Sequence, residues 1–482
     1  MKKSSLPKTV FFVLFVFAAG ACMKSGPDYS RPDTGFEVPG SFNSAGGTET
    51  SAYVAQNSWW EAFGDRELNR AVMEAVKNNP DVAGAAAGIM EARAVFEQTA
   101  SDRLPSVDLE ASASTQQQAV INPVTGQTVT VERDDFTLSI PASFELDLWG
   151  RLARASQAAR ADLLAAEQNR RTVVQSLVAE TVDLYLKIRS LDLQIKITRE
   201  MVETHENKLD LVRNRYQQGL ASALDVRQAG LALAQAAAGL PSLVESRGRA
   251  AHSLSVLKGG YPENRISEYT ENRDFRIPPP VPAGLPSQLL ARRADVLAAE
   301  ASLEAASARI GVARADRFPR ISLTGSFGYT SGELSGLFEP ESRLWRMAAG
   351  GFQPVFDGGA GAARERAARA RYEREAASYA KTVLNAFAEV EDSLFARRQL
   401  LERRERIAQV AAESRAALEI AEDRYERGLE GYFNVIDARH SLYQAELDLV
   451  QAGYEIQANR VKLHRALGGG WDKAFDIYGE KP

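Results

Sequence analysis

The feature that most limits what this chain can fold into is a helical segment too long for an ordinary globular domain. No proline or glycine occurs from Arg151 to Gln218, so a continuous helix there would be roughly 100 Å long. The chain turns back at Arg215-Tyr216-Gln217-Gln218-Gly219, which predicts a long helical hairpin over 150–258. Apolar residues recur every seven positions, as in a coiled-coil seam. They form two interleaved series: Leu177, Leu184 and Leu191, and Ile188, Ile195, Val202, Leu209 and Tyr216.

The same pattern occurs a second time. Arg215-Tyr216-x-x-Gly219-Leu220 is matched 209 positions later by Arg424-Tyr425-x-x-Gly428-Leu429, and a second long hairpin is predicted over 359–467. Asp102-Arg103-Leu104-Pro105 is likewise matched by Asp316-Arg317-Phe318-Pro319. We interpret the chain as a duplication, with a first structural repeat at 57–275, a second at 276–470 and a C-terminal tail at 471–482. In both turns the glycine can adopt the positive φ that ends a helix.

Each repeat also contains short helices and two stretches in which apolar and polar residues alternate. The alternation predicts strands over 106–118, 135–147, 320–330 and 344–356, and a helix is predicted over 284–317. Strands of roughly ten residues have the length that a tilted strand needs to cross a membrane. Four strands cannot close a barrel, and an open sheet edge cannot face lipid. The fold class is therefore mainly α with a β-barrel to which several chains contribute, two chains giving eight strands or three giving twelve.

The N-terminus has the layout of a secretory signal peptide, predicted over 1–21. Three lysines precede the apolar stretch Val10 to Ala19, and Ala19-Gly20-Ala21-Cys22 follows. Cys22 is the only cysteine, so it has no disulfide partner within the chain. The small residues before it resemble the lipobox of bacterial lipoproteins, which implies lipidation of Cys22 and a lipidated tether over 22–56. An ordinary cleavage site with a chance cysteine is the alternative.

Composition and motifs argue against nucleic-acid binding and catalysis. The chain has 58 basic and 63 acidic residues without a basic block, so nucleic acid is not expected as a partner. No nucleophile elbow, phosphate loop or dinucleotide fingerprint occurs. The four histidines, His205, His252, His440 and His464, lie in predicted helices without the spacing of a metal site. We therefore expect no enzyme activity, no metal and no cofactor other than the covalent lipid.

Several pieces, in this order along the chain, resemble a known family. They are Cys22 with Gly26-Pro27-Asp28-Tyr29-Ser30-Arg31-Pro32, Phe144-Glu145-Leu146-Asp147-Leu148-Trp149-Gly150-Arg151, the two Arg-Tyr-x-x-Gly-Leu turns, Ile436-Asp437-Ala438-Arg439, and Ala466-Leu467-Gly468-Gly469-Gly470-Trp471. The chain resembles the TolC/OprM-like outer-membrane efflux factors, in the lipoprotein (NodT) branch that serves resistance-nodulation-division pumps.

The resemblance implies a homotrimer in the outer membrane of a Gram-negative bacterium. Three chains would share a twelve-stranded transmembrane barrel anchored by lipid, and their hairpins would form a periplasmic tunnel. A periplasmic adaptor, the membrane fusion protein, would dock on the tip of the tunnel and connect it to an inner-membrane pump. Substrates would then pass passively across the periplasm and the outer membrane.

The resemblance also assigns roles to residues near the two turns. Asp437 and Asn434 would line the periplasmic aperture. Asn434 replaces the aspartate found in some members, so Asp437 alone would form the ring of like charges that holds cations; a solvated surface carboxylate is the alternative for Asp437. Asp225 and Tyr425 would restrain neighbouring hairpins, and the basic partner found in some members is replaced by Glu430. Gly219, Leu220, Gly428 and Leu429 would form the hairpin turns and the adaptor-docking surface.

Two functions other than efflux stay open from the sequence. A type I protein secretion conduit shares the fold, and a non-conducting coiled-coil scaffold of the envelope needs only the helices. The exported substrate, whether drug, solvent, metal ion or siderophore, does not follow from the residues.

Overall fold

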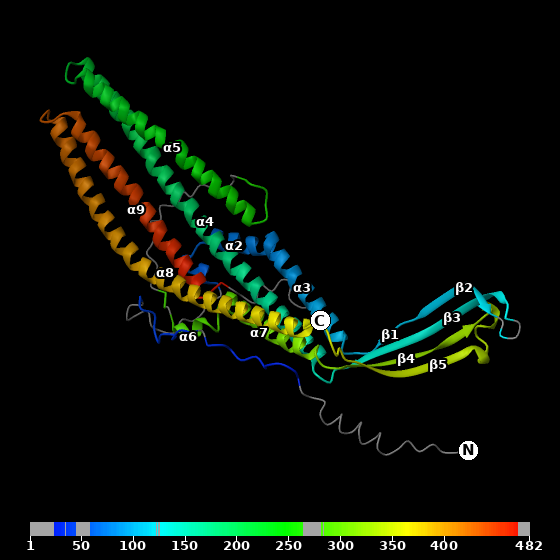
Figure 1. Cartoon of the computed structure of the whole chain (residues 1–482). Helices are drawn as coiled ribbons and strands as arrows, with labels where there is room; N and C mark the ends of the chain where they lie inside the picture. The colour runs from blue at the N-terminus through cyan, green and yellow to red at the C-terminus, as the bar shows by residue number, and fades with distance from the viewer. Residues whose placement is uncertain are drawn as a thin grey trace. The chain divides into compact units, whose positions relative to one another are not determined.

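The computed structural model describes residues 24–33, 35–44, 58–121, 123, 126–263, 281–282 and 284–470 (Figure 1). The signal peptide, Cys22 and the tail 471–482 lie outside the described residues. The described chain divides into two compact units. Unit 1 contains 24–33, Ile89–Ala166 and Ala299–Tyr379, and unit 2 contains 35–88, Glu167–Ala298 and 380–470. Each unit therefore takes residues from both sequence repeats, so the repeats do not fold as separate domains.

Long helices dominate the described chain. The first repeat contains the 3-10 helix η1 (Trp59–Phe63), the short helices α2 (Arg66–Asn78) and α3 (Pro80–Ser101), and the hairpin α4 (Arg151–Gln217) and α5 (Ala223–Leu257). The second contains α6 (Pro286–Leu289), α7 (Ala294–Ala315), and the hairpin α8 (Ala360–Glu426) and α9 (Tyr432–Ala466). The strands are β1 (Ser106–Val107), β2 (Glu110–Ile121), β3 (Thr128–Leu146), β4 (Arg320–Ser331) and β5 (Arg343–Phe352), with 3-10 turns η2 (Leu334–Gly336) and η3 (Pro340–Ser342) between β4 and β5.

Aspartates begin both 67-residue helices. The Asp147 carboxylate accepts the backbone N–H groups of Leu152 and Ala153 at 3.1 and 2.8 Å. Asp357 accepts those of Gly359 and Gly361 at 2.8 and 2.6 Å. These side chains satisfy donors that have no partner within the helix and place negative charge at its positive end. The two halves thus pass from strand to long helix in the same way.

The strands form one antiparallel sheet in which β1 and β2 both pair with β3, followed by β4 and β5. One register row joins Ile140, Phe327 and Trp345, and the next joins Pro141, Ser326 and Arg346. Because neighbouring rows point to opposite faces, one face carries large apolar side chains and the other small or polar ones. That is the two-faced pattern of a membrane barrel strand.

Several strand bounds depart from the sequence prediction, among them the end of β2 at Ile121 rather than 118. The predicted strand 106–118 is split after Val107, opposite Pro141, which has no N–H to donate to the ladder. β3 begins at Thr128 rather than 135, because the polar stretch before Phe136 pairs with β2 as a continuous ladder. β5 begins one residue early and ends at Phe352 rather than 356, close to Pro354. The sequence prediction included only the part of β3 from Phe136 on in which large apolar residues alternate with polar ones.

The predicted helix 284–317 is wrong at its start, because the chain breaks between α6 and α7. Arg293 lies in this break with only 9% of its side chain exposed. It donates to Asp295 at 2.6 and 2.9 Å, to Glu389 at 2.7 Å and to the carbonyl of Ala466 at 3.2 Å. A buried guanidinium requires such partners, and the break brings them together.

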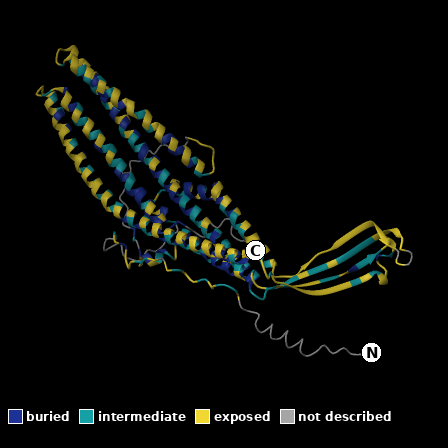
Figure 2. Cartoon of the chain, viewed as in Figure 1, coloured by how far each residue is buried: buried dark blue, intermediate teal, exposed yellow. Residues whose placement is uncertain are grey.

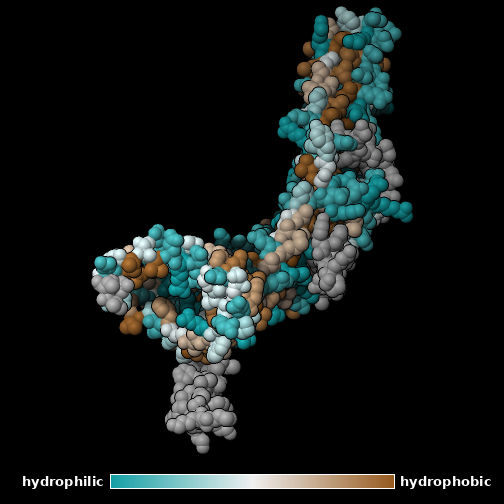
Figure 3. Space-filling model, turned by 90° about the vertical axis from the view of Figure 1, so that its right-hand side faces the viewer, coloured by the Kyte–Doolittle hydropathy of each residue, from teal (hydrophilic) through white to brown (hydrophobic). Residues whose placement is uncertain are grey.

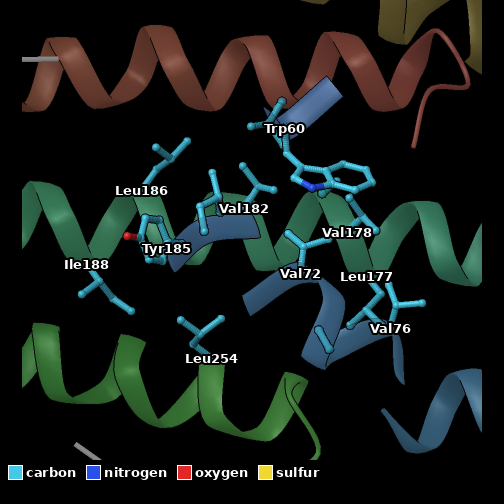
Figure 4. Packing of buried hydrophobic residues seen from close by; sticks show 14 of the residues in the cluster. Trp60, Val72, Val76, Leu177, Val178, Val182, Tyr185, Leu186, Ile188 and Leu254 are labelled. Atoms are coloured by element: carbon cyan, nitrogen blue, oxygen red, sulfur yellow. The ribbon is translucent and has the colours of Figure 1, made fainter. Parts of the chain in front are cut away.

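Unit 2 has a hydrophobic core around the middle of α4 (Figure 4). Val178, Val182 and Leu186 of α4 are almost fully buried. Apolar side chains of α2, α5 and η1 pack against them, including the adjacent Trp59 and Trp60, which are 1% and 2% exposed. Trp59 stacks on His464 with ring centroids 4.9 Å apart. Figure 2 shows buried residues along the helices and mostly exposed ones on the strands.

No helix in the described part of the chain combines the length and apolar character needed to cross a membrane.

Candidate functional site

Both long hairpins of unit 2 turn through the same backbone motif. Gly219 and Gly428 have φ of +76° and +74°. The Leu220 N–H donates to the Arg215 carbonyl at 2.8 Å, and the Leu429 N–H donates to the Arg424 carbonyl at 2.9 Å. Each bond runs from the N–H of residue i+5 to the carbonyl of residue i, which is the pattern of a Schellman cap and favours glycine at the left-handed position.

The turns expose apolar side chains. Leu220 is 64% exposed and Leu429 is 63% exposed, and apolar side chains also gather on the surface toward the hairpin ends (top of Figure 3). About a third of each leucine is covered within the chain, so a partner protein that contacts the turns could bury the remaining apolar surface.

A small core holds the two hairpins together just behind the turns. Val212 of α4, Ala229 of α5 and Val435 of α9 are nearly fully buried in it, with Leu418 of α8. Tyr425 lies at its edge, with the Arg215 guanidinium 4.9 Å from its ring and the Tyr432 ring 5.1 Å away. Burial raises the pKa of Tyr425, Arg215 opposes that change and Asp225 adds to it. The predicted restraint residues Tyr425 and Asp225 therefore lie near each other.

Asp225 has a structural role of its own in the described chain. Its carboxylate accepts hydrogen bonds from the backbone N–H and the hydroxyl of Ser222, both at 2.8 Å, while the Asp225 N–H donates to the Ser222 hydroxyl at 3.2 Å. This is a capping box at the start of α5. The assigned restraint between hairpins stays a prediction, and Asp225 is already engaged within its own hairpin.

The predicted aperture residues lie on the exposed surface of α9. Asn434 and Asp437 are three positions apart, so they share one side of the helix. Asn434 donates to the Glu430 carboxylate at 3.0 Å, and Glu430 also pairs with Arg424 at 2.7 Å across the turn. Glu430 stands where some family members have a basic residue that pairs with a neighbouring hairpin. In this chain it forms a salt bridge within its own hairpin. The structure leaves the aperture role untested.

A charged network between the hairpins was not identified from the sequence. Glu422 of α8 contacts Lys208 of α4 at 3.1 Å and also pairs with Arg439 of α9. His205 lies beside this network and is 4% exposed. Burial lowers the pKa of His205, and Arg439 and His440 lower it further. The lysine and glutamate are 214 positions apart, so no local pattern could have revealed the pair.

Unit 1 contains a second feature that the sequence did not reveal. The segment 24–33, expected to be a simple tether, is bound along α4 and α7, and we call it the strap. Arg154, 2% exposed, donates to the carbonyls of Ser25 and Gly26 at 3.1 and 3.4 Å and to Asp28 at 2.8 Å. A Cβ on Gly26 would lie 2.5 Å from the Cα of Gly311. Further along, Arg31 donates two bonds to Glu300 at 2.7 and 2.6 Å.

The described residues contain no group of three or more His, Cys, Asp or Glu side chains arranged to hold a metal ion. His464, the most buried of the histidines, lies against Trp59 in the core rather than at an exposed site.

Comparison with known proteins agrees with this arrangement. The family model described as "Outer membrane efflux protein" matches residues 71–260 and again 285–469, which reproduces the duplication. The chain is 33% identical to outer membrane protein OprJ of Pseudomonas aeruginosa over 465 residues, covering 96% of each. It is 30% identical to the probable outer membrane lipoprotein SilC of Salmonella typhimurium, covering 95% of this chain and 97% of the relative.

The solved structure of the outer-membrane channel OprN superposes with a TM-score of 0.86 at 32% identity, over 93% of this chain and 99% of that one. The long helical hairpins, the two-faced sheet and the twofold family match confirm the resemblance inferred from the sequence. The chain belongs to the outer membrane efflux protein family, and its fold is that of an outer-membrane efflux channel.

Proposed function

We propose that three copies of this chain form the outer-membrane channel of a tripartite efflux system. The chain is an outer-membrane efflux channel by family and by fold. The proposal adds the trimer, the adaptor on the hairpin tips, the resistance-nodulation-division pump and the lipid on Cys22. It also makes the protein a passive conduit rather than an enzyme. Efflux is favoured over type I secretion and over a scaffold because relatives along nearly the whole chain are efflux proteins.

The observation that carries the proposal is the sheet with two open edges. β1 and β2 form one edge and β5 forms the other, and each edge leaves backbone N–H and C=O groups without partners. Such groups cannot face lipid. Because β1 and β2 lie along the same edge, the antiparallel sheet is four strands wide and its two edge strands run in opposite directions. β5 of one copy can therefore pair with β2 of the next. Three copies give the twelve strands of the proposed barrel, whose polar face would line the lumen.

The hairpin ends support the rest of the assembly. Leu220 and Leu429 are exposed on turns that two glycines of positive φ form, which suits docking of a partner protein. Asp437 is exposed on the same hairpin as Leu429 and would narrow the tunnel together with Asn434. The strap binds residues 24–33 to unit 1, so a lipid on Cys22 would sit two residues from a fixed point.

The test is the native mass of the protein extracted in a neutral detergent, combined with its conductance in planar bilayers. We expect a complex of three mature chains and discrete conductance steps, and an acylated Cys22 in the intact mass of the N-terminal peptide. A monomer or a dimer would offer at most eight strands and would contradict the proposal. A trimer that does not conduct would leave the scaffold in its place.

A further inference from the structure

Unit 1 contains a groove that the channel fold alone does not explain. It has a volume of about 740 Å³ and is lined by α4, α7 and α8, with two residues of α3 at one end. Pockets of this size hold drug-sized molecules. All its lining residues belong to unit 1.

The floor of the groove is apolar and smooth. It is made of small side chains, among which Ala158, Ala159, Ala306 and Ala368 are buried in the packing between helices. Alanines leave room above the helices, and they offer a flat apolar surface without hydrogen-bonding groups. A planar or rigid apolar body fits such a floor.

The rim of the groove is basic. Four arginines line it: Arg309, Arg364, Arg371 and Arg374. Arg309 pairs with Asp162, and Arg374 pairs with Glu375 at 2.8 Å. The third acidic residue of the lining, Asp316, pairs with Arg320 at 2.7 Å.

The other two arginines of the rim are exposed, and Arg364 lies close enough to the Asp357 carboxylate to help lower the pKa of that group. Arg364 and Arg371 form no ion pair with any residue in the described ranges. They lie seven positions apart on α8, so they recur on one side of the helix with Cα atoms about 10 Å apart. Their guanidinium groups can bind a carboxylate or sulfonate through paired N–H donors.

We propose that this groove binds amphipathic organic anions, with the apolar body on the alanine floor and the acidic group at Arg364 and Arg371. The inference rests on the proposed function, because a binding groove in the wall matters only if cargo passes it. It names a substrate class for that conduit, small aromatic or alicyclic acids. Cations of the same shape would be disfavoured by the same arginines.

The test uses the purified full chain in a neutral detergent at low salt. Equilibrium dialysis would compare 2-naphthalenesulfonate with the naphthyl trimethylammonium cation, which has a similar apolar body and the opposite charge. We expect the sulfonate to bind more tightly than the cation and to bind about tenfold more weakly to the R364Q/R371Q double variant, since each exposed charge contact is worth up to about fivefold.

A matched control is the double variant R314Q/R366Q. Both residues are exposed arginines of α7 and α8 outside the lining, so the control removes the same net charge. Equal binding of the anion and the cation, or an equal loss in the control, would overturn the inference. Bilayer conductance of the same variants is measured separately, so failure of the groove is distinguishable from failure of the channel.

Discussion

At the scale of single residues, His464 shows how burial fixes a protonation state. Burial lowers the pKa of His464 to about 3, and Arg460 adds to the effect. The unfolded chain would bind this proton near pH 6.5, whereas the folded chain excludes it until about pH 3. The neutral histidine therefore favours folding fully above pH 6.5, and its contribution is lost as the pH falls below that value.

We expect the chain to lose about 3 kcal/mol of stability through His464 between pH 7 and pH 4. His464→Phe keeps an aromatic ring on Trp59 and removes the titration. Its free energy of unfolding should therefore depend less on pH over this range, as measured by denaturant unfolding at several pH values. His252, an exposed histidine of α5, provides the control: His252→Phe should retain the dependence. An unchanged pH profile in His464→Phe would mean that other groups cause it.

Gly311 is the residue on which strap binding depends most directly. A Cβ at this position would lie 2.6 Å from the Ser25 carbonyl oxygen and 2.9 Å from the Arg154 side chain. We expect Gly311→Ala to displace the strap and to make residues 24–33 accessible to a protease of broad specificity. Gly84→Ala in α3 meets no atom within 4 Å and should stabilise its helix by about 0.5–1 kcal/mol. Equal protease resistance in the two variants would show that the strap tolerates the extra atom.

At the scale of elements, the hairpin ends were predictable from the sequence because local rules decide them. The helix bounds 151–217 and 360–426 follow from long runs without helix breakers, and Gly219 and Gly428 supply the φ that ends them. The first half of β3 was not predicted, since the charged run 132–135 interrupts the alternation of Thr128-Val129-Thr130-Val131 and pairing with β2 makes the whole stretch one strand. The strap was missed because Arg154 binds backbone carbonyls more than 125 positions away, which leave no signal in side-chain identity.

The same elements define a test of docking. We expect the double variant Leu220→Asp and Leu429→Asp to reach the membrane in normal amount but to lose pump-dependent resistance. Burying a leucine is worth about 1.5–3 kcal/mol, so adaptor binding should weaken by more than about tenfold. Leu231→Asp changes a leucine of α5 that is 58% exposed and lies away from the turns, so it should have no effect. Drug susceptibility measures resistance, and immunoblots of membranes measure the amount of each variant. Full resistance in the double variant would refute docking at the turns.

At the scale of the whole molecule, the proposed trimer would multiply each surface charge by three. Asp437 is exposed and would form a ring of three carboxylates at a narrow aperture, which attracts cations and repels anions. Asp437→Asn should therefore shift the reversal potential in a salt gradient toward zero. Asp423→Asn removes an exposed carboxylate that pairs with Arg427 at 2.8 Å, and it should leave the selectivity unchanged. If both variants behave alike, Asp437 is a solvated surface carboxylate.

The β2–β3 ladder continues for eight positions beyond Phe136, from Thr128 to Asp135, where its side chains are mostly polar. That part of the hairpin would stand outside the cell, clear of the bilayer. The chain has a single cysteine, which acylation at Cys22 would convert to a thioether. Gln117→Cys would then give live bacteria one reactive thiol per subunit at their surface, and a membrane-impermeant maleimide dye could count and follow these channels without a fused tag.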